Sequence, residues 1–483
     1  MSEEPEHWSR LHPATLAIRA VERLPQLVLG LPAAAYFIGD SGIFVALLLA
    51  VVGLAASMLF AFIYWRRFTY WVGAEQLVIE SGILNRNRRT IPFDRIQDIS
   101  LEQKLLARLF GVSIVRIETG SSGGDEGELN CVSREEADRL RDRIRAYRAD
   151  TAVSADAIDE NTAAAPPPLY GMTFGRLVVA GLFNFSLVFL AILGGVWQYM
   201  GSYLPADYLD PSRWIGDYRE QAIGLVSALS VVSFVMLLLL VGVVTGLMRT
   251  IARDFGFRLT LTETGLRRKR GLFTRTDVVI PLRRVQAGIV STGVIKRLFG
   301  WSGLSVQSLG SDGDAGTHHV VAPLAKPDDL IPILDALNLP PPPPVDDFTR
   351  VSSKLIWRSW AQDGTALAIA VVIASFFWSG WPSLMVLAPF ILIAPVLQYR
   401  AHGYCFEKDI LFVRRGFWRP RVTILPLAKV QSVTLVRGLT QQGFGLATLA
   451  IGAAGGSAAT PLRILDLDES TGRRVLGERL CIE

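Results

Sequence analysis

Charge is scarce in this sequence. Asp, Glu, Lys and Arg make up 19% of its 483 residues, against about 25% in ordinary soluble proteins, and hydrophobic residues make up 50%. This composition excludes a disordered chain, a disulfide-rich scaffold and a collagen-like fibre. The 49 basic and 44 acidic residues are nevertheless too many for a chain that lies wholly in a membrane. We therefore expect apolar membrane spans that alternate with water-facing domains.

Cysteines are few, and the common catalytic motifs are absent. The three cysteines, Cys131, Cys405 and Cys481, are far apart and lack metal-type spacing, which favours reduced thiols in the cytosol. The sequence contains no H-E-x-x-H, G-x-S-x-G, Walker A or paired C-x-x-C motif. It therefore predicts no enzyme activity, no cofactor and no metal.

Two segments resemble ligand loops without completing them. His318 and His319 follow the Gly- and Asp-rich segment 310–316, where a hairpin loop is favoured and a metal site is the alternative. The Gly-rich segment 120–124 lacks the Lys and the helix that follow a phosphate-binding loop. We interpret both segments as hairpin loops.

Four long runs contain no charged residue, namely 41–65, 177–206, 221–248 and 364–399. A helix needs about 20 apolar residues to cross the hydrocarbon core of a membrane. A weaker apolar stretch precedes the first run, and a turn at 379–383 divides the last. The sequence thus predicts six spans in three hairpins: 24–39 with 42–65, 177–200 with 221–248, and 364–380 with 383–399. A buried core helix is the alternative for any single run.

Basic residues flank the hairpins and are not in excess in the loops within them. Arg66 and Arg67 follow the first hairpin, Arg249 and Arg253 the second, and Arg400 the third. Since basic residues mark the cytoplasmic side, we expect both termini and all large soluble segments in the cytoplasm. The N-terminus does not read as a secretory signal peptide.

One segment occurs three times, once after each hairpin. Counting from a first Gly, each copy has Pro at +10, a basic residue at +13, Gln at +15, Phe at +28 and Gly at +29, without a gap. Such repetition indicates three copies of one domain. We interpret this signature as structural; it comprises Gly82, Pro92, Arg95, Gln97, Phe110, Gly111, Gly271, Pro281, Arg284, Gln286, Phe299, Gly300, Gly416, Pro426, Lys429, Gln431, Phe444 and Gly445.

Each copy has the pattern of short strands followed by a helix. In the first copy, strands are expected at 68–72 and 77–80, separated by a turn. Ser133 and Glu136 have the spacing of a capping box at the start of a helix over 134–148. Six or seven short strands and one helix predict a small β-sandwich or barrel.

The Ile-Pro-x-x-Arg-Ile-Gln pattern at 91–97, the Leu-Phe-Gly at 109–111 and the hairpin before each copy resemble the bacterial pleckstrin-homology-like (PH-like) domain family. Three such units look like the YdbT-type membrane proteins. The resemblance implies a bacterial cytoplasmic (inner) membrane protein, with a seven-stranded β fold and a C-terminal helix in each copy. The third copy departs from the pattern at Lys429 and Gly443.

The predicted fold class is membrane α-helical plus all-β, with six transmembrane helices in three hairpins, each followed by a cytoplasmic PH-like domain. The hairpins are expected at 11–65, 171–248 and 348–399, the last with an interfacial helix, and the domains at 66–148, 249–339 and 400–483. A flexible linker (149–170) and a proline-rich linker (340–347) join them.

Basic residues near the turns are the strongest functional signal. The candidates for contact with a lipid headgroup or a partner are Arg86, Arg88, Arg89, Arg267, Arg268, Lys269, Arg270, Arg414 and Arg415. Each Lys or Arg near an anionic leaflet contributes about 1 kcal/mol to membrane binding. A solvated strand face is the alternative reading. A net charge of only +5 favours a membrane surface over nucleic acid.

We therefore expect an inner-membrane scaffold or assembly protein. Its PH-like domains would bind anionic lipids of the bilayer, another membrane protein, or each other. The alternative is a small-molecule or lipid transporter or flippase that uses the six spans. Uncharged spans argue against ion-coupled transport, and their polar residues Asn184, Ser186 and Gln198 fit hydrogen bonds between helices.

Overall fold

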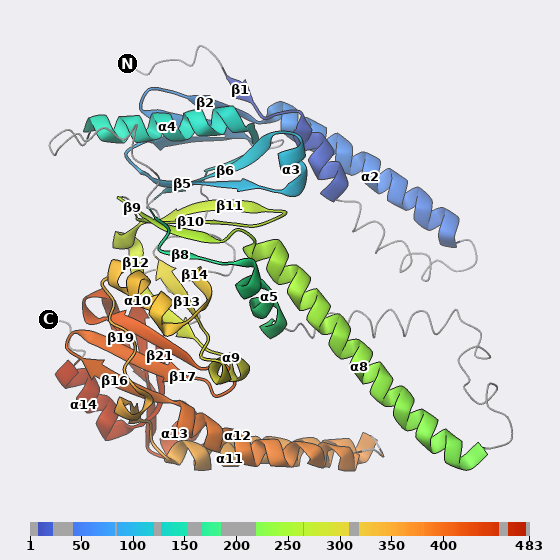
Figure 1. Cartoon of the computed structure of the whole chain (residues 1–483), viewed down its shortest axis with the longest axis vertical. Coiled ribbons are helices and arrows are strands. Elements are labelled where there is room, and N and C mark those ends of the chain that lie inside the picture. Colours follow the sequence, from blue (N-terminus) through green and yellow to red (C-terminus); the bar gives the residue numbers. More distant parts are fainter. Residues whose placement is uncertain are drawn as a thin grey trace.

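The computed structural model describes residues 8–22, 42–82, 85–119, 127–151, 167–184, 219–263, 265–308, 318–377, 379, 381–453 and 462–479. Its strands form four antiparallel sheets, and its long apolar helices project from the same side of these sheets (Figure 1). We call this the helix side.

The two outer sheets are small. The first has the order β1–β2–β3–β4, with β1 at Ser9–Arg10, β2 at Thr69–Val72, β3 at Gln76–Ser81 and β4 at Asn87–Pro92. The fourth has the order β19–β20–β21, with β19 at Val430–Val436, β20 at Leu446–Ala453 and β21 at Leu462–Asp468.

The two inner sheets have seven strands each. The second has the order β7–β6–β5–β11–β10–β9–β8, with β5 at Ile96–Gln103, β6 at Val112–Thr119, β7 at Gly127–Ser133, β8 at Tyr170–Gly171, β9 at Arg258–Thr262, β10 at Gly265–Arg270 and β11 at Arg275–Ile280. The third has the order β14–β13–β12–β18–β17–β16–β15, with β12 at Val285–Ser291, β13 at Ser302–Ser308, β14 at His318–Ala325, β15 at Thr349–Arg350, β16 at Gly403–Glu407, β17 at Ile410–Arg415 and β18 at Arg421–Pro426.

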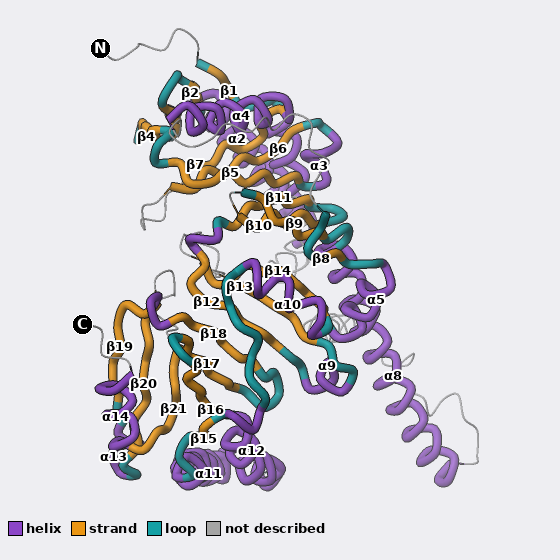
Figure 2. Tube along the Cα trace, turned by 60° about the vertical axis from the view of Figure 1, so that its left-hand side comes forward, coloured by secondary structure: helices purple, strands orange, loops and turns teal. Residues whose placement is uncertain are grey.

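Each repeat is therefore divided between two sheets, and consecutive repeats share one. The last three strands of the first repeat continue into the first four strands of the second, and the second repeat joins the third in the same way (Figure 2). The apolar cores interlock as well, because Phe412 and Ile424 of the third repeat lie in the core of the second. The sequence predicted the three β units but not these shared sheets.

The helices fall into a long and a short class. The long ones are α2 (Gly42–Arg67), α4 (Arg134–Thr151), α8 (Arg219–Asp254), α11 (Lys354–Phe377) and α12 (Ala388–Ala401). The shorter ones are α3 (Leu105–Leu109), α5 (Phe174–Phe183), α9 (Val294–Leu298), α10 (Pro327–Ala336), α13 (Leu439–Gly443) and α14 (Glu469–Arg479). α4, α10 and α14 end the three repeats where the sequence placed helices, and the Ser133 hydroxyl accepts from the Glu136 N–H, 3.3 Å.

The described residues contain three stretches long and apolar enough to cross a membrane: Leu47–Arg67, Lys354–Phe377 and Leu384–Ala401. They do not support the count of six transmembrane helices. The predicted span 221–248 lies within α8, whereas 24–39 lies outside the described residues and 177–200 is described only as far as residue 184. The interfacial helix expected near 348–362 is not separate, because α11 runs without a break from Lys354 to Phe377.

A short strand precedes the long helices in every repeat. This short strand pairs with a strand that follows the predicted hairpin in the sequence: β1 with β2, β8 with β9 and β15 with β16. The apolar helices are thus inserted between the first and second strands of each β unit, whereas the sequence placed each unit wholly after its hairpin. Both ends of the inserted segment are therefore anchored in a sheet.

The repeat signature marks backbone irregularities. Gln97, Gln286 and Gln431 each lie at a break in strand register, where one residue is left without a cross-strand partner. This is the pattern of a β-bulge. Gly271 has a backbone φ of +110°, which residues with a side chain rarely adopt. The signature is thus structural at these positions.

Candidate functional site

Two junctions join the three repeats with the same register. In the first, β5 pairs with β11 and Glu102 lies opposite Thr276; in the second, β12 pairs with β18 and Ser291 lies opposite Arg421. Glu102 and Ser291 are each the twentieth residue after the first signature Gly of their repeat, and Thr276 and Arg421 are each the fifth. The two junctions are therefore copies of one interface.

Each junction brings a short helix of one repeat next to a hairpin loop of the following repeat. β5 leads into α3 and β12 leads into α9, while the loops 271–274 and 416–420 lead into β11 and β18. The contact is direct at the second junction, where the Thr292 N–H donates to the Pro420 carbonyl, 2.8 Å. Each junction thus combines residues from two repeats.

The short helices expose large apolar side chains. Leu109 of α3 is 79% exposed, Leu298 of α9 is 80% exposed and Leu439 of α13 is 89% exposed. Phe110, Phe273, Phe299 and Trp418 in the adjoining turns and loops are exposed too. Leu109 and Leu298 occupy the same position in their repeats, and Leu439 lies on the corresponding helix of the third repeat. Apolar groups exposed on the same short helix of all three repeats indicate a surface that is covered by a membrane or a partner.

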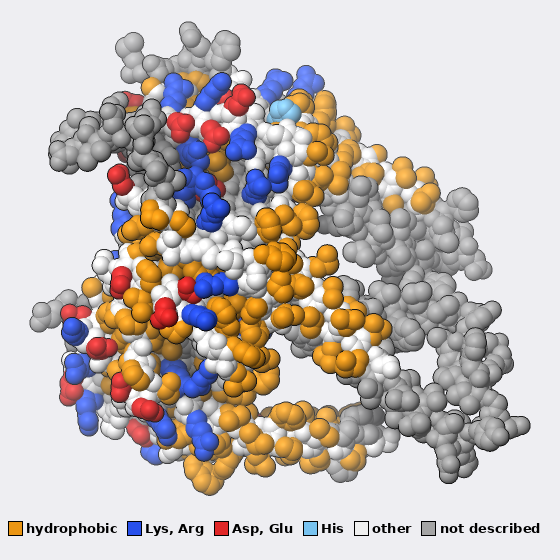
Figure 3. Space-filling model, viewed as in Figure 1, with side chains coloured by type: hydrophobic (Ala, Val, Ile, Leu, Met, Phe, Trp, Pro, Cys, Tyr) orange, Lys and Arg blue, Asp and Glu red, His pale blue; other side chains and the backbone are white. Residues whose placement is uncertain are grey.

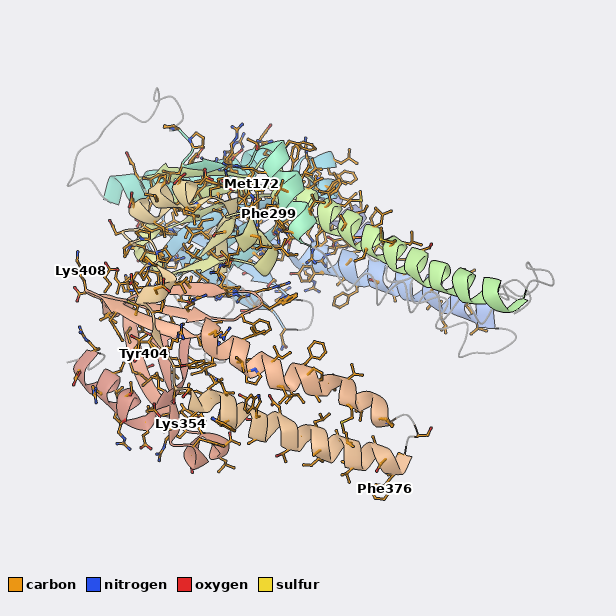
Figure 4. The ribbon with its side chains drawn as sticks, turned by 60° about the horizontal axis from the view of Figure 1, so that its bottom comes forward. Met172, Phe299, Lys354, Phe376, Tyr404 and Lys408 are labelled. Carbon is orange, nitrogen blue, oxygen red and sulfur yellow. The ribbon has the colours of Figure 1, made fainter. Side chains whose placement is uncertain are left out.

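These exposed helices lie on the helix side. The ammonium of Lys104, directly before α3, donates to the carboxylate of Glu22 at 2.7 Å. Glu22 lies on the helix that precedes the predicted span 24–39. The Phe299 ring after α9 lies 6.0 Å from the Phe183 ring of α5, and α13 contacts α11. In Figure 4, Phe376 marks the far tip of α11, whereas Lys408 lies across the sheets from it. The exposed apolar residues therefore lie where the apolar helices leave the sheets.

Basic residues gather around α9 at the second junction. Burial lowers the pKa of Lys296, and the charges of Arg253 and Arg419 lower it further. Burial likewise lowers the pKa of Arg414, with Arg297 acting in the same direction. Arg253 also pairs with Asp254, 2.8 Å. Burial and the neighbouring positive charges disfavour the charged forms of Lys296 and Arg414, and a nearby anion would favour those forms again. This cluster is therefore suited to an anionic group such as a phosphate.

The surface separates apolar and charged side chains. Hydrophobic side chains cover the projecting helices, and Lys, Arg, Asp and Glu gather over the β units in the face shown in Figure 3. Arg253 of the basic cluster lies in the last turn of α8, where this apolar helix joins the sheets, and Trp418 next to Arg419 is exposed. Basic and aromatic side chains are typical of the boundary between hydrocarbon and water.

Two residues of the basic run of β10, Arg267 and Lys269, pair with an acidic residue of the same repeat. Arg267 donates to both carboxylate oxygens of Asp277, at 2.9 and 2.7 Å, and Lys269 lies 3.6 Å from Asp277. Burial alone would raise the pKa of Asp277, but the bonds from Arg267 outweigh it and hold that pKa below its usual value.

The alternate residues of β10 point into the protein. Arg268 is buried, and its guanidinium donates to the Val320 carbonyl, 3.1 Å; burial lowers its pKa to about 9. Arg270 pairs with the fully buried Asp254, 3.2 Å. The structure thus does not bring Arg267, Arg268 and Arg270 to a free surface.

The other predicted contact residues differ in exposure. Arg86 and Arg88 are exposed, and Arg88 lies 3.6 Å from Glu80. Arg89, Arg414 and Arg415 are half-buried. The nine candidates therefore do not form one surface.

Sequence reasoning missed the exposed apolar residues, because the recurring Leu-Phe pair was assigned to the fold. A usable signal was present: Lys104 with Arg108 and Lys296 with Arg297 flank apolar residues that directly precede a turn glycine. Basic residues next to exposed apolar residues are typical of an interfacial segment.

Two other expectations concern polar groups. The Asn184 amide donates to the Thr250 hydroxyl, 3.1 Å, which joins α5 to α8 and confirms the interhelical role; Ser186 and Gln198 lie outside the described residues. His318 and His319 begin β14. Within the described ranges, no group of three or more His, Cys, Asp or Glu side chains is placed to hold a metal.

Comparisons with known proteins agree with this architecture. The model of the bacterial PH domain family matches three segments, 26–148, 212–338 and 363–474. The chain is similar to the UPF0699 transmembrane protein YdbT of Bacillus subtilis (strain 168), with 23% identity over 429 residues that cover 86% of this chain and 85% of that protein. No solved structure matches the chain. The three matches confirm the threefold repeat, and the relative, together with the apolar helices, indicates a membrane protein.

Proposed function

Because the chain belongs to the bacterial PH domain family, we propose that it is an inner-membrane scaffold whose PH-like domains form one rod along the membrane. The observation that carries this proposal is the pair of shared sheets. Backbone hydrogen bonds cross both borders between repeats, so the repeats hold fixed positions relative to one another. A rod of fixed spacing can hold lipids, membrane partners or further copies in a defined order.

The proposed topology has six spans in three hairpins, with both termini and the rod in the cytoplasm. The basic flanks Arg66, Arg67, Arg249, Arg253 and Arg400 support it. A reporter fused after Asp150 should prove cytoplasmic, and one inserted within 205–215 should prove external. A cytoplasmic reporter within 205–215 would exclude the second hairpin.

The proposed lipid contact is with anionic headgroups at the junctions. The basic cluster around Lys296 and the exposed apolar residues of α3, α9 and α13 support it. Spin-labelled phosphatidylglycerol should associate with the full chain in preference to phosphatidylcholine. Since each basic residue contributes about 1 kcal/mol, replacing Lys296, Arg297 and Arg419 by Ala should reduce this preference by roughly tenfold or more.

A matched control replaces three exposed arginines of the C-terminal helices, Arg143, Arg474 and Arg479, by Ala. This variant should keep the preference. An equal loss in both variants would mean that net charge alone attracts the lipid, and the junction site would then be wrong.

The scaffold role is tested by crosslinking the full chain in cells and identifying the captured membrane proteins. A reproducible set of captured proteins, or of captured copies of the chain, is expected. The scaffold would be wrong if the protein captured neither and showed no preference for anionic lipid. Substrate flux in proteoliposomes would instead favour a transporter.

A further inference from the structure

Two strand edges are left over by the junctions. Within the chain, β5 and β12 pair outward with β11 and β18 of the following repeat. Among the described strands, β19 is the counterpart of β5 and β12, and β4 is the counterpart of β11 and β18, but each ends its sheet. The edge of a sheet presents unpaired N–H and C=O groups that can accept another strand.

Burial shows what the missing neighbour would cover. Gln286 in the bulge of β12 is 3% exposed, whereas its counterpart Gln431 in β19 is exposed. Along β19, Thr434 and Val436 are exposed, although no residue of β12 is. In the second repeat, β12 is covered by β18 of the third repeat. The corresponding surface along β19 of the third repeat is therefore exposed.

We infer that β19 of one copy pairs with β4 of a second copy, so that chains join head to tail. This inference rests on the scaffold function proposed above and names its partner. The shared register of the internal junctions fixes the pairing: Thr434 should lie opposite Arg89 of the second copy, and Val436 opposite its Asn87.

The arrangement of the chain permits such growth. β4 lies at one end of the molecule and β19 at the other, so one copy does not close on itself (Figure 2). A contact between two different surfaces adds copies in one direction and gives a ring or a filament. The apolar helices of all three repeats leave the same side of the sheets (Figure 1), so a further copy added by the same kind of junction keeps its apolar helices on that side.

The added copy would also complete the third junction site. α13 exposes Leu439 but carries Gln441 and Gln442 in place of the basic residues of α3 and α9. At the internal junctions, the loop before the incoming strand lies beside the short helix. The corresponding loop of the second copy ends in the exposed Arg86, which would supply a positive charge next to α13.

The test uses two full-length variants with different tags, Thr434→Cys and Arg89→Cys, expressed together in membranes. Mild oxidation should give a disulfide between the two differently tagged chains. Thr434→Cys with Asn87→Cys is the control, because Asn87 is on the same face of β4 but two residues out of register. The Cα atoms would then be about 7–8 Å apart, beyond disulfide reach.

A positive control checks that the pairing geometry allows a bond. Ile289 and Thr423, the counterparts of Thr434 and Arg89, lie opposite each other within one chain, so Ile289→Cys with Thr423→Cys should crosslink internally. The wild-type chain reports any crosslink through its own cysteines.

If the positive control crosslinks but the Thr434–Arg89 pair does not, the inference is overturned. Crosslinking of the out-of-register pair at the same rate, or of Thr434→Cys only to a different protein, would overturn it too. The scaffold function would survive each of these results if the chain still captures membrane partners.

Discussion

Arg270 of β10 donates to the carboxylate of Asp254 at the end of α8, over 3.2 Å, and Asp254 is fully buried. Arg253 bonds the same carboxylate at 2.8 Å. The Gly271 N–H, next to Arg270, donates to the Phe255 carbonyl, 2.9 Å. A long apolar helix is thereby fixed to the sheet that the first two repeats share.

Replacing Asp254 by Ala should destabilise the protein by about 3 kcal/mol, because it leaves the largely buried charge of Arg270 without its partner. Unfolding of the purified protein by heat or denaturant measures this loss. Asp468→Ala is the control, since its pair with Lys354, 2.9 Å, is exposed and should contribute less than about 1 kcal/mol. Equal losses in the two variants would contradict a structural role for the Asp254 pair.

Replacing Gly271 by Ala should lower stability by roughly 1–3 kcal/mol, because its φ of +110° strains any side chain. The new Cβ would also overlap the Thr274 carbonyl oxygen. Gly364→Ala in α11 is the control, since its Cβ would meet open space and helix propensity should improve. Thermal unfolding compares the two, and a tolerated Gly271→Ala would mean that the loop before β11 is wrongly placed.

Acidification should destabilise the protein through His402. Burial lowers the pKa of His402 to about 4, and Arg415 acts in the same direction. Since the unfolded chain binds this proton near pH 6.5, the stabilising contribution is complete above pH 6.5 and is lost as the pH falls toward 4. The melting temperature of the wild type should therefore drop more steeply over this range than that of His402→Gln. Parallel pH profiles would show that His402 does not contribute.

Leu109 should lie within the membrane surface. A Leu109→Trp variant should show blue-shifted fluorescence that brominated lipids quench. Arg143→Trp is the control, because Arg143 lies farther from α3. The N–H of Arg134, at the start of α4, donates to the carbonyl of Gly111 beside α3, and Arg143 lies nine residues further along α4. That spacing is roughly 14 Å along the helix. If both tryptophans are quenched alike, or neither is, α3 does not contact the bilayer.

Local patterns in the sequence were enough to predict the repeated β units. Alternation gave strands at 68–72 and 77–80, which the structure has at Thr69–Val72 and Gln76–Ser81. The fixed spacing of Gly, Pro and Gln reflects turns and bulges, which depend on neighbouring residues only. The terminal helix over 134–148 follows from its cap and its apolar stripe in the same way.

The shared sheets could not be predicted, because strand alternation defines the faces of a strand but not its edge partners. Nothing in the local sequence of β5 identifies β11, which lies in the next repeat. The basic run of β10 was misleading for a related reason. Its four positions alternate between two faces, and the acids that meet it, Asp254 and Asp277, come from other elements. A strict period of two would have assigned Arg268 and Arg270 to the inner face.

The central claim is that consecutive repeats share one sheet, and an intramolecular disulfide across the first junction tests it most directly. Glu102 and Thr276 lie opposite each other on β5 and β11, so Glu102→Cys with Thr276→Cys should crosslink within single full-length chains in native membranes. Glu102→Cys with Val278→Cys, two residues out of register, should not. Rapid bonding of the first pair alone is the predicted result, and no bonding, or equal bonding of both pairs, would contradict the shared sheet.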